Sequence, residues 1–359
     1  MKRVPLIILG AGKVGRTLIR QFIEAETLHA QRDGLAFPIV AWCDSRGAVV
    51  AAGNGLAPAS LQELAAAKTA AVALAETAFG YRQEDAAAIV DVAGTDGCIV
   101  VDVSASSATV PALELALRRG YGAVTANKVP LAGEQAIFDR LAGRNRFRYE
   151  STVGSAVPVI ETARALMRAA DRVDVVRGAL SGTLGFLCTG LQAGRPFSQL
   201  VQEAMQRGYT EPDPRIDLSG QDVARKALII ARTLGWRLEL ADVVVASLVP
   251  VELAGPTLPE FLARLPAEHD DGFAEQAAQA AAEGCVLRYI AELRDGTANV
   301  GLRSVPVATA LGRLSGSDNL VAFHTRYYPD QPLVLQGRGA GADAAAAGVH
   351  ADIVALAGG

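Results

Sequence analysis

The glycine-rich segment at residues 10–15, GAGKVG, constrains the fold more than any other part of this sequence. It follows an apolar run, residues 4–9, and it opens an amphipathic helix that continues to about Ala25. In this context GxGxxG is typical of a dinucleotide-binding α/β fold with a doubly wound parallel sheet. The glycines let the backbone approach a pyrophosphate, and the helix N-terminus offers free N–H groups. The cofactor residues expected here are Gly10, Gly12, Lys13, Val14 and Gly15.

Composition limits the classes of partner. A chain of 359 residues exceeds what one compact core usually organises, so we expect two domains. The net charge is −4 with no basic block, and no apolar run approaches the length of a membrane span, so we expect no nucleic-acid or membrane partner. The cysteines lack paired spacing, which indicates reduced thiols in a cytoplasm and neither a zinc site nor a disulfide framework. They are Cys43, Cys98, Cys188 and Cys285.

The end of the second expected strand, residues 39–43, bears on the choice of cofactor. Asp44 and Arg46 follow that strand directly. An acidic residue there can bind the 2′-hydroxyl of NAD, whereas an arginine can bind the 2′-phosphate of NADP. Because Arg46 is joined by Lys13 in the glycine loop, we favour NADP and leave NAD open.

Two further apolar strands, residues 98–103 and 122–125, end in polar side chains. Ser104 and Ser106 follow the first, and Lys128 follows the second. Ligands gather at the carboxyl ends of strands in open α/β sheets, so we predict all three at the cofactor. The alternatives are serines that only cap the next helix and a lysine in a solvated loop.

Residues 208–235 contain the clearest candidate for chemistry. We expect a polar turn and then a helix from Ser219 to about Gly235, with Ser219 as the N-cap and Asp222 as its capping-box carboxylate. Asp222 and Lys226 are four residues apart and share a helix face. Such a pair alone is most often a surface salt bridge, but the turn holds more ionisable groups than a cap requires, which favours a site for a charged small molecule. These groups belong to Tyr209, Glu211, Asp213, Arg215 and Asp217.

The later pattern indicates a second domain and a return to the first. From about residue 158 a helix, a strand at 173–180 and a GTLGF segment follow one another. Near the C-terminus, glycines up to Gly341 precede an alanine-rich helix, which suggests that the chain returns to cover the cofactor. The domains expected are 1–157 for the nucleotide, 158–308 for the substrate and for dimerisation, and 309–359 for the return.

These motifs together resemble the homoserine dehydrogenase family along nearly the whole chain. They are GAGKVG, DVSAS, TANK, YESTVGSAVP, GTLGF, GYTEPDPRIDLSGQDVARK and PLVLQGRGAGADAAAAGV. The resemblance implies a Rossmann-type domain, an α+β domain that binds substrate and carries homodimer contacts, and a C-terminal return. It also implies interconversion of L-homoserine and L-aspartate 4-semialdehyde with NAD(P), on the route to threonine, methionine and isoleucine.

The resemblance also implies roles for individual residues. Lys226 is the expected acid/base, Asp222 its partner, Glu211 the carboxylate for the substrate amine, and Lys128 a lysine between nicotinamide and substrate. The remaining pocket residues expected are Gly182, Thr183, Tyr209 and Asp217. The backbone carbonyls expected at a monovalent-cation site, usually described with sodium, are those of Glu150, Val153, Ser155 and Val157. Gly185 and Ile216 depart from the family pattern, at positions where it commonly has an asparagine and a second acid.

Two other classes of protein are weaker interpretations. A semialdehyde dehydrogenase that forms a thioester needs an activated cysteine, and no histidine flanks a cysteine in this sequence. A non-catalytic NAD(P)-sensing protein would keep the glycine loop but not the set of Asp222, Lys226 and Lys128. The sequence also leaves no room for a regulatory ACT domain or an aspartate kinase, so we expect weak or no inhibition by threonine.

Overall fold

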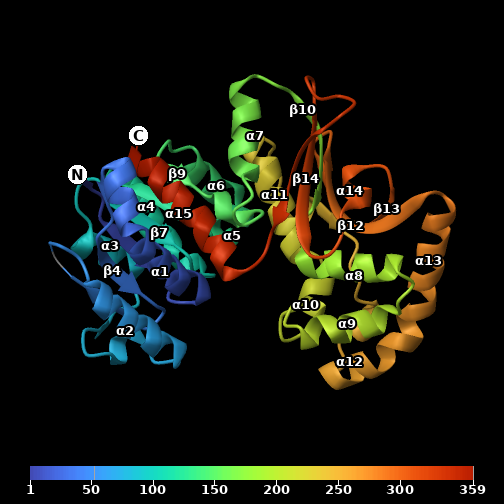
Figure 1. Ribbon diagram of the computed structural model, residues 1–359, viewed down its shortest axis with the longest axis horizontal. Helices are drawn as coiled ribbons and strands as arrows, with labels where there is room; N and C mark the ends of the chain where they lie inside the picture. Colours follow the sequence, from blue (N-terminus) through green and yellow to red (C-terminus); the bar gives the residue numbers. More distant parts are fainter. Residues whose placement is uncertain (52, 359) are drawn as a thin grey trace. The chain divides into compact units, whose positions relative to one another are not determined.

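The computed structural model describes residues 1–51 and 53–358. They form two compact units, one of residues 1–156 with 341–359 and one of residues 157–340 (Figure 1). Within the described residues, no helix combines the length and apolar character needed to cross a bilayer.

The first unit is built on a seven-stranded sheet in the order β6-β5-β4-β2-β7-β8-β9. Strands β4, β2, β7, β8 and β9 run parallel, while β5 and β6 are antiparallel additions at one edge. Strand β2 lies between β4 and β7, so the order reverses there and makes the switch point where doubly wound folds bind ligands. The strands are β2 (Leu6–Leu9), β4 (Ile39–Cys43), β5 (Gly47–Val50), β6 (Tyr81–Arg82), β7 (Ile99–Asp102), β8 (Gly122–Thr125) and β9 (Phe147–Arg148).

Helices cover this sheet, and the predicted α/β class is confirmed. Helix α1 opens directly after the glycine loop and packs along α15, the last helix of the chain (Figure 1). Their shared core includes Leu18 and Ile353, both fully buried. A two-stranded sheet, β1 (Lys2–Arg3) with β3 (Leu35–Ala36), lies beside them. The helices are α1 (Lys13–Leu28), α2 (Pro58–Thr69), α3 (Ala86–Ala93), α4 (Val110–Arg118), α5 (Lys128–Ala132), α6 (Gln135–Ala142) and α15 (Ala342–Gly358).

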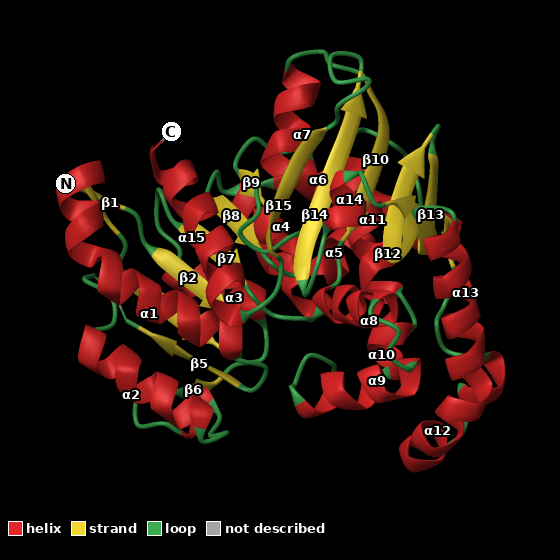
Figure 2. Cartoon of the chain, turned by 45° about the vertical axis from the view of Figure 1, so that its right-hand side comes forward, coloured by secondary structure: helices red, strands yellow, loops and turns green. Residues whose placement is uncertain are grey.

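The second unit contains a six-stranded mixed sheet in the order β11-β13-β12-β10-β14-β15, drawn in yellow in Figure 2. The pairings are antiparallel except that of β11 with β13. The strands are β10 (Val173–Ala179), β11 (Val243–Val245), β12 (Cys285–Arg294), β13 (Thr297–Pro306), β14 (Asp318–Thr325) and β15 (Leu333–Arg338). The helices are α7 (Val159–Arg168), α8 (Gly182–Gln192), α9 (Phe197–Gln206), α10 (Arg215–Leu218), α11 (Gln221–Thr233), α12 (Leu258–Leu265), α13 (Asp271–Ala282) and α14 (Ala310–Arg313).

The return to the first unit is shorter than the expected 309–359. Strand β14 pairs with β10 from Val173 to Ala179, and β15 pairs with β14. Leu320 and Phe323 of β14 are fully buried there. Because β14 and β15 belong to the second sheet, residues 309–340 lie in the second unit. Only residues 341–359, essentially α15, belong to the first unit.

Candidate functional site

The glycine loop has the geometry of a phosphate cradle. A Cβ on Gly10, whose φ is +117°, would lie 2.8 Å from the Val103 carbonyl carbon. A Cβ on Gly15 would lie 2.2 Å from the Gly10 oxygen, so helix α1 packs against the loop only without a side chain there. A Cβ on Gly12, the N-cap of α1, would meet nothing within 4 Å. The N-terminus of α1 is therefore open to an anion.

A cleft of about 560 Å³ adjoins this loop at the carboxyl ends of the strands. Its walls bring together five of the eleven residues predicted at the cofactor, and they add Lys68, which the sequence did not indicate. The predicted residues outside this lining are Lys13, Val14, Gly15, Arg46, Lys128 and Gly341. The lining includes Gly10, Gly12, Asp44, Lys68, Ser104 and Ser106.

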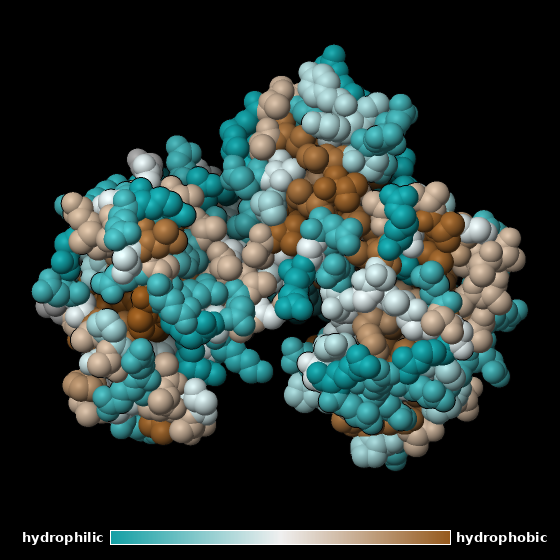
Figure 3. Space-filling view, viewed as in Figure 1, coloured by the Kyte–Doolittle hydropathy of each residue, from teal (hydrophilic) through white to brown (hydrophobic). Residues whose placement is uncertain are grey.

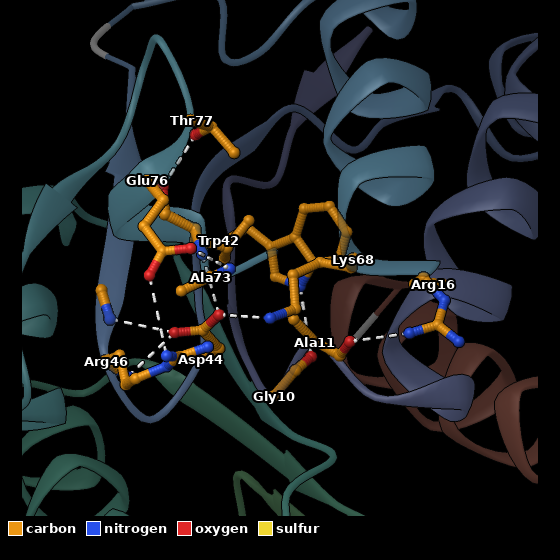
Figure 4. Close-up of polar contacts among 12 residues, drawn as sticks. Gly10, Ala11, Arg16, Trp42, Asp44, Arg46, Lys68, Ala73, Glu76 and Thr77 are labelled. Carbon is orange, nitrogen blue, oxygen red and sulfur yellow. Dashed lines mark hydrogen bonds and ion pairs between the residues drawn. The ribbon is translucent and has the colours of Figure 1, made fainter. Parts of the chain in front are cut away.

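Asp44 is committed to the protein itself (Figure 4). One carboxylate oxygen accepts the backbone N–H groups of Arg46 and Gly47 at 2.9 and 3.0 Å. The other accepts Lys68 Nζ at 2.6 Å and the Leu74 N–H at 2.9 Å. Lys68 and the backbone donors hold the pKa of the Asp44 carboxyl below its ordinary value although burial alone would raise it. Four donors fill its acceptor sites, so a ribose hydroxyl finds none in this arrangement.

The two cationic side chains near Asp44, those of Lys68 and Arg46, differ in solvent exposure. The side chain of Lys68 is 13% exposed and lines the cleft, whereas that of Arg46 is 60% exposed and lies 3.7 Å from Glu76 (Figure 4). The sequence left both NADP and NAD open as cofactors. This geometry favours NADP, because the 2′-phosphate of NADP needs cations beside it.

Helix α11 begins later than expected. It starts at Gln221 after Gly220, whose φ of +73° makes a left-handed turn, and it has no side-chain cap. Ser219 Oγ donates to the Ile216 carbonyl of α10 at 2.7 Å and accepts the Gln221 N–H at 3.3 Å. The predicted capping box of Ser219 and Asp222 is therefore wrong, because Gly220 occupies the N-cap position and the Asp222 carboxylate pairs with Lys226.

Lys226 is held at the end of strand β10. Its Nζ lies 2.8 Å from Asp222 Oδ2 and donates to the Leu180 carbonyl at 2.7 Å. The lysine side chain is 12% exposed and that of Asp222 is 45% exposed. An ammonium has three protons, and these two partners leave one for a ligand oxygen. Leu180 leads directly into α8, which starts at Gly182.

The first turn of α8 meets the polar turn that precedes α11. Thr183 Oγ1 donates to the Tyr209 carbonyl at 2.6 Å and to Asp217 Oδ1 at 3.2 Å. Asp217 Oδ2 accepts the Glu211 N–H at 2.8 Å. Burial raises the pKa of Asp217 above its ordinary value, and the nearby Glu211 charge adds to that rise. The structure thus gathers four of the predicted substrate residues, and Gly182 begins the same helix.

Comparison with known proteins decides the family. Residues 158–354 match the family model of homoserine dehydrogenase. A homoserine dehydrogenase of Paracoccidioides brasiliensis is 38% identical over 273 residues, which cover 71% of this chain and 73% of that protein. The chain belongs to the homoserine dehydrogenase family.

Other relatives extend beyond this chain. A bifunctional aspartokinase/homoserine dehydrogenase of Haemophilus influenzae is 40% identical over 262 residues, which cover 71% of this chain but 32% of that protein. A hyperthermophilic archaeal homoserine dehydrogenase solved in complex with NADPH has the same fold, with a TM-score of 0.74 at 20% identity over 98% of this chain and 97% of that one.

The two departures from the homoserine dehydrogenase pattern have structural settings. A Cβ on Gly185 would lie 3.0 Å from the Gly316 carbonyl oxygen, so the short distance between α8 and that loop favours glycine. Ile216 is 57% exposed. The isoleucine that stands where the family commonly has an acid is therefore not packed into the core. Neither position lies among the contacts of Lys226 described above.

The carbonyls that the family would use for a monovalent cation are partly engaged. The Glu150 carbonyl accepts the Val153 N–H at 3.2 Å, and the Val157 carbonyl accepts the Val159 N–H at 2.8 Å. Ser155 takes a φ of +59°, and its carbonyl faces α15, where a Cβ on Gly348 would lie 2.3 Å away. The cation at Glu150, Val153, Ser155 and Val157 stays a prediction.

Proposed function

We propose that this protein interconverts L-homoserine and L-aspartate 4-semialdehyde with NADP, with Lys226 as the acid/base. The observation that carries the proposal is the Lys226 ammonium, oriented by Asp222 and Leu180 beside the polar pocket of Thr183 and Asp217. When bound, the dinucleotide supplies or accepts the hydride.

Lys226 would manage the proton that accompanies this hydride. Reduction of an aldehyde leaves an alkoxide, and an ammonium in place both stabilises that oxyanion and gives it a proton. In the reverse direction the neutral amine accepts the hydroxyl proton of homoserine. The Leu180 carbonyl and the Asp222 carboxylate fix the position of Nζ, so the remaining proton points in a defined direction.

The acidic turn suits the ammonium of an amino-acid substrate. Asp217 is half-buried and its two oxygens are anchored by Thr183 and the Glu211 backbone. A substrate ammonium would compensate a carboxylate whose ionisation burial otherwise disfavours. The Glu211 side chain, expected to hold the substrate amine, and Tyr209 lie on the same turn and complete the pocket proposed for the amino group.

The first unit would bind NADP through the α1 N-terminus, Ser104 and Ser106, with Gly341 at the start of α15. Lys68 and Arg46 would contact the 2′-phosphate. The Asp44 carboxylate already accepts four hydrogen bonds, and these donors reduce its repulsion of the phosphate. Lys128 of the first unit would lie beside the nicotinamide, the role that the family resemblance implies. A monovalent cation at the 150–157 loop completes the proposal.

A thioester mechanism is disfavoured by the thiols. Burial raises the pKa of Cys43 and Cys98 to about 12 and that of Cys188 to about 11, so these sulfurs stay protonated. All four cysteines of the chain are free thiols, which agrees with a cytoplasmic location.

We also propose a homodimer formed through the second unit. Hydrophobic residues gather over β10, β14 and β12 in Figure 3. A groove of about 610 Å³ lies on this sheet, with Val305 and Val334 among its lining and Arg177 and His324 beside them. A second copy would cover these apolar side chains. Light scattering after size exclusion tests the dimer, and a monomer at micromolar concentration would contradict it.

Steady-state kinetics test the activity. The purified protein should form NADPH from NADP⁺ when L-homoserine is added, and should not do so with L-serine, whose hydroxyl is one methylene nearer the ammonium. Absence of turnover with L-homoserine and either dinucleotide would overturn the proposed function.

A further inference from the structure

A buried polar network lies at the carboxyl ends of β7 and β8, beneath the proposed cofactor site. Its centre is Asp102, the last residue of β7, which is fully buried. One of its oxygens accepts the Ser104 N–H at 3.0 Å. The other accepts Thr109 Oγ1 at 2.7 Å and Asn127 Nδ2 at 3.0 Å. The carboxylate therefore fixes the backbone of the serine loop that lines the cofactor cleft.

Asn127 connects that loop to the residue before Lys128. Its side chain is buried, with 2% of the residue exposed. Beyond its bond to Asp102, Nδ2 donates to the Ser106 carbonyl at 2.8 Å and approaches Ser104 Oγ at 3.3 Å. Its Oδ1 accepts the Val129 N–H at 3.0 Å and so caps α5, whose first residue is Lys128.

We propose that Asn127 is a positioning residue that holds the Ser104–Ser106 loop and Lys128 in one fixed arrangement. The inference rests on the proposed function, because it assigns the two ends of this link to the cofactor and to the reacting centre. An amide is needed, since one end must accept from α5 while the other donates to a carboxylate and a carbonyl. Aspartate would cap the helix equally well but has no donor when ionised, and the hydroxyl of serine or threonine has one proton where the amide has two.

The substitution Asn127→Asp separates this role from simple capping. The new carboxylate keeps an oxygen for the Val129 N–H, so α5 stays capped. Its second oxygen faces the Asp102 carboxylate and the Ser106 carbonyl, where the donor stood. We expect the KM for NADP⁺ to rise about 10-fold or more and kcat to fall at neutral pH, because a hydrogen bond to a charged group is replaced by repulsion.

The pH profile gives a readout that a purely structural role would not move. Two carboxylates in contact share a proton as the pH falls, and the shared proton restores a donor between them. The variant's kcat/KM should therefore recover towards the wild-type value as the pH is lowered. Cys43 is the titratable group near Asp102, and its thiol, with a pKa of about 12, stays neutral. Lys128 is the next residue in the chain after Asn127.

Thr109→Val is the matched control. It removes a donor at 2.7 Å to the same carboxylate oxygen but leaves the link to α5 intact. We expect a lower Tm, because one of three donors to Asp102 is lost. The KM for NADP⁺ should stay within about 3-fold of wild type, and kcat/KM should not increase as the pH is lowered.

The double variant Asp102→Asn/Asn127→Asp covers the case in which Asn127→Asp does not fold. It exchanges the amide and the carboxylate between positions 102 and 127. One hydrogen bond between the end of β7 and the N-cap of α5 is kept, and no two carboxylates face each other. Its KM should return to within about 3-fold of wild type and lose the unusual pH dependence. A folded double variant with a raised, pH-independent KM would contradict the inference, as would Asn127→Asp with wild-type kinetics. An inactive wild-type protein would instead refute the proposed function.

Discussion

The Nζ atom of Lys226 lies 2.8 Å from Asp222 Oδ2, one helical turn away on α11. The pair is asymmetric, because the lysine is almost covered while nearly half of the aspartate side chain is exposed. The bond from Nζ to the Leu180 carbonyl ties the lysine to the end of β10, where α8 begins. The ion pair thus serves to aim an ammonium, and as a surface contact alone it would contribute little to stability.

Replacing Asp222 with asparagine should lower kcat more than it lowers stability. The amide can still contact Nζ through its oxygen but no longer favours the charged lysine, so we expect a loss of about 10-fold in kcat, the size of one charge-assisted hydrogen bond. Glu268→Gln is the matched control, because Arg264 and Glu268 form another pair four residues apart in the same unit. Equal kinetics for both variants would remove Asp222 from its proposed role.

Lys68→Met should change the cofactor preference. It removes a cation from the proposed 2′-phosphate site and at the same time releases an Asp44 oxygen for a ribose hydroxyl. We expect the ratio of kcat/KM for NADP⁺ to that for NAD⁺ to fall by about 10- to 100-fold, the range for a hydrogen bond to a charged group. Lys2→Met, which removes a lysine bonded to the Ala357 carbonyl of the same unit, should leave the ratio unchanged. A variant that still prefers NADP⁺ as strongly as wild type would count against Lys68.

Asp217 should shape the acid side of the pH–activity profile. Its pKa lies above the ordinary 3.8, chiefly because of burial, and it must be ionised to hold a substrate ammonium. Activity at low homoserine concentration should therefore fall with decreasing pH earlier than an ordinary aspartate would predict. Asp217→Asn should raise the KM for homoserine and abolish that dependence, so a variant with the wild-type profile would assign it to another group.

The raised pKa of Asp217 affects stability in the opposite direction to activity, because acid pH lowers the activity but favours the folded state. Because the folded protein binds the Asp217 proton more tightly than the unfolded chain, this residue favours folding at acid pH and loses that contribution as the pH rises through its folded pKa. Asp217→Asn should thus raise the Tm at neutral pH while it weakens substrate binding. A lower Tm at neutral pH would show that the hydrogen bonds from Thr183 and Glu211 outweigh the cost of burial.

His350 should make the first unit sensitive to acid. Its Nε2 lies 2.6 Å from Nε2 of His29, whose other nitrogen lies 2.9 Å from Asp33, and the pair joins α15 to the end of α1. Burial, with the charges of His29 and Arg32, lowers the pKa of His350 from 6.5 to about 4. Its contribution is therefore complete above pH 6.5 and is lost as the pH falls towards 4. His350→Gln should flatten the decline of Tm over that range, and an unchanged decline would contradict this account.

Local patterns were enough to predict the elements that carry the site. Strand β4 lies at residues 39–43 as expected. A short, continuous apolar run in an α/β protein is typical of a strand buried on both faces of a parallel sheet. The spacing of Asp222 and Lys226 predicted their contact, since residues four apart on a helix are neighbours. These features depend on residues close in sequence.

Features that depend on distant residues could not be read in this way. Lys68 reaches Asp44 across 24 positions, because the antiparallel strand β5 brings α2 back to the end of β4. Asn127 meets Asp102 across 25 positions because β7 and β8 are neighbours in the sheet. The start of α11 was missed for a local reason, since Gly220 adopts a left-handed conformation and occupies the N-cap position in place of Ser219.

The oxidation of L-homoserine by Lys226→Ala, compared with wild type at saturating NADP⁺, tests the central claim most directly. The account predicts that the variant binds NADPH with unchanged affinity in a fluorescence titration and loses about 10²- to 10⁴-fold in kcat, the usual contribution of a positioned proton donor. Turnover by Lys226→Ala at the wild-type rate would contradict it.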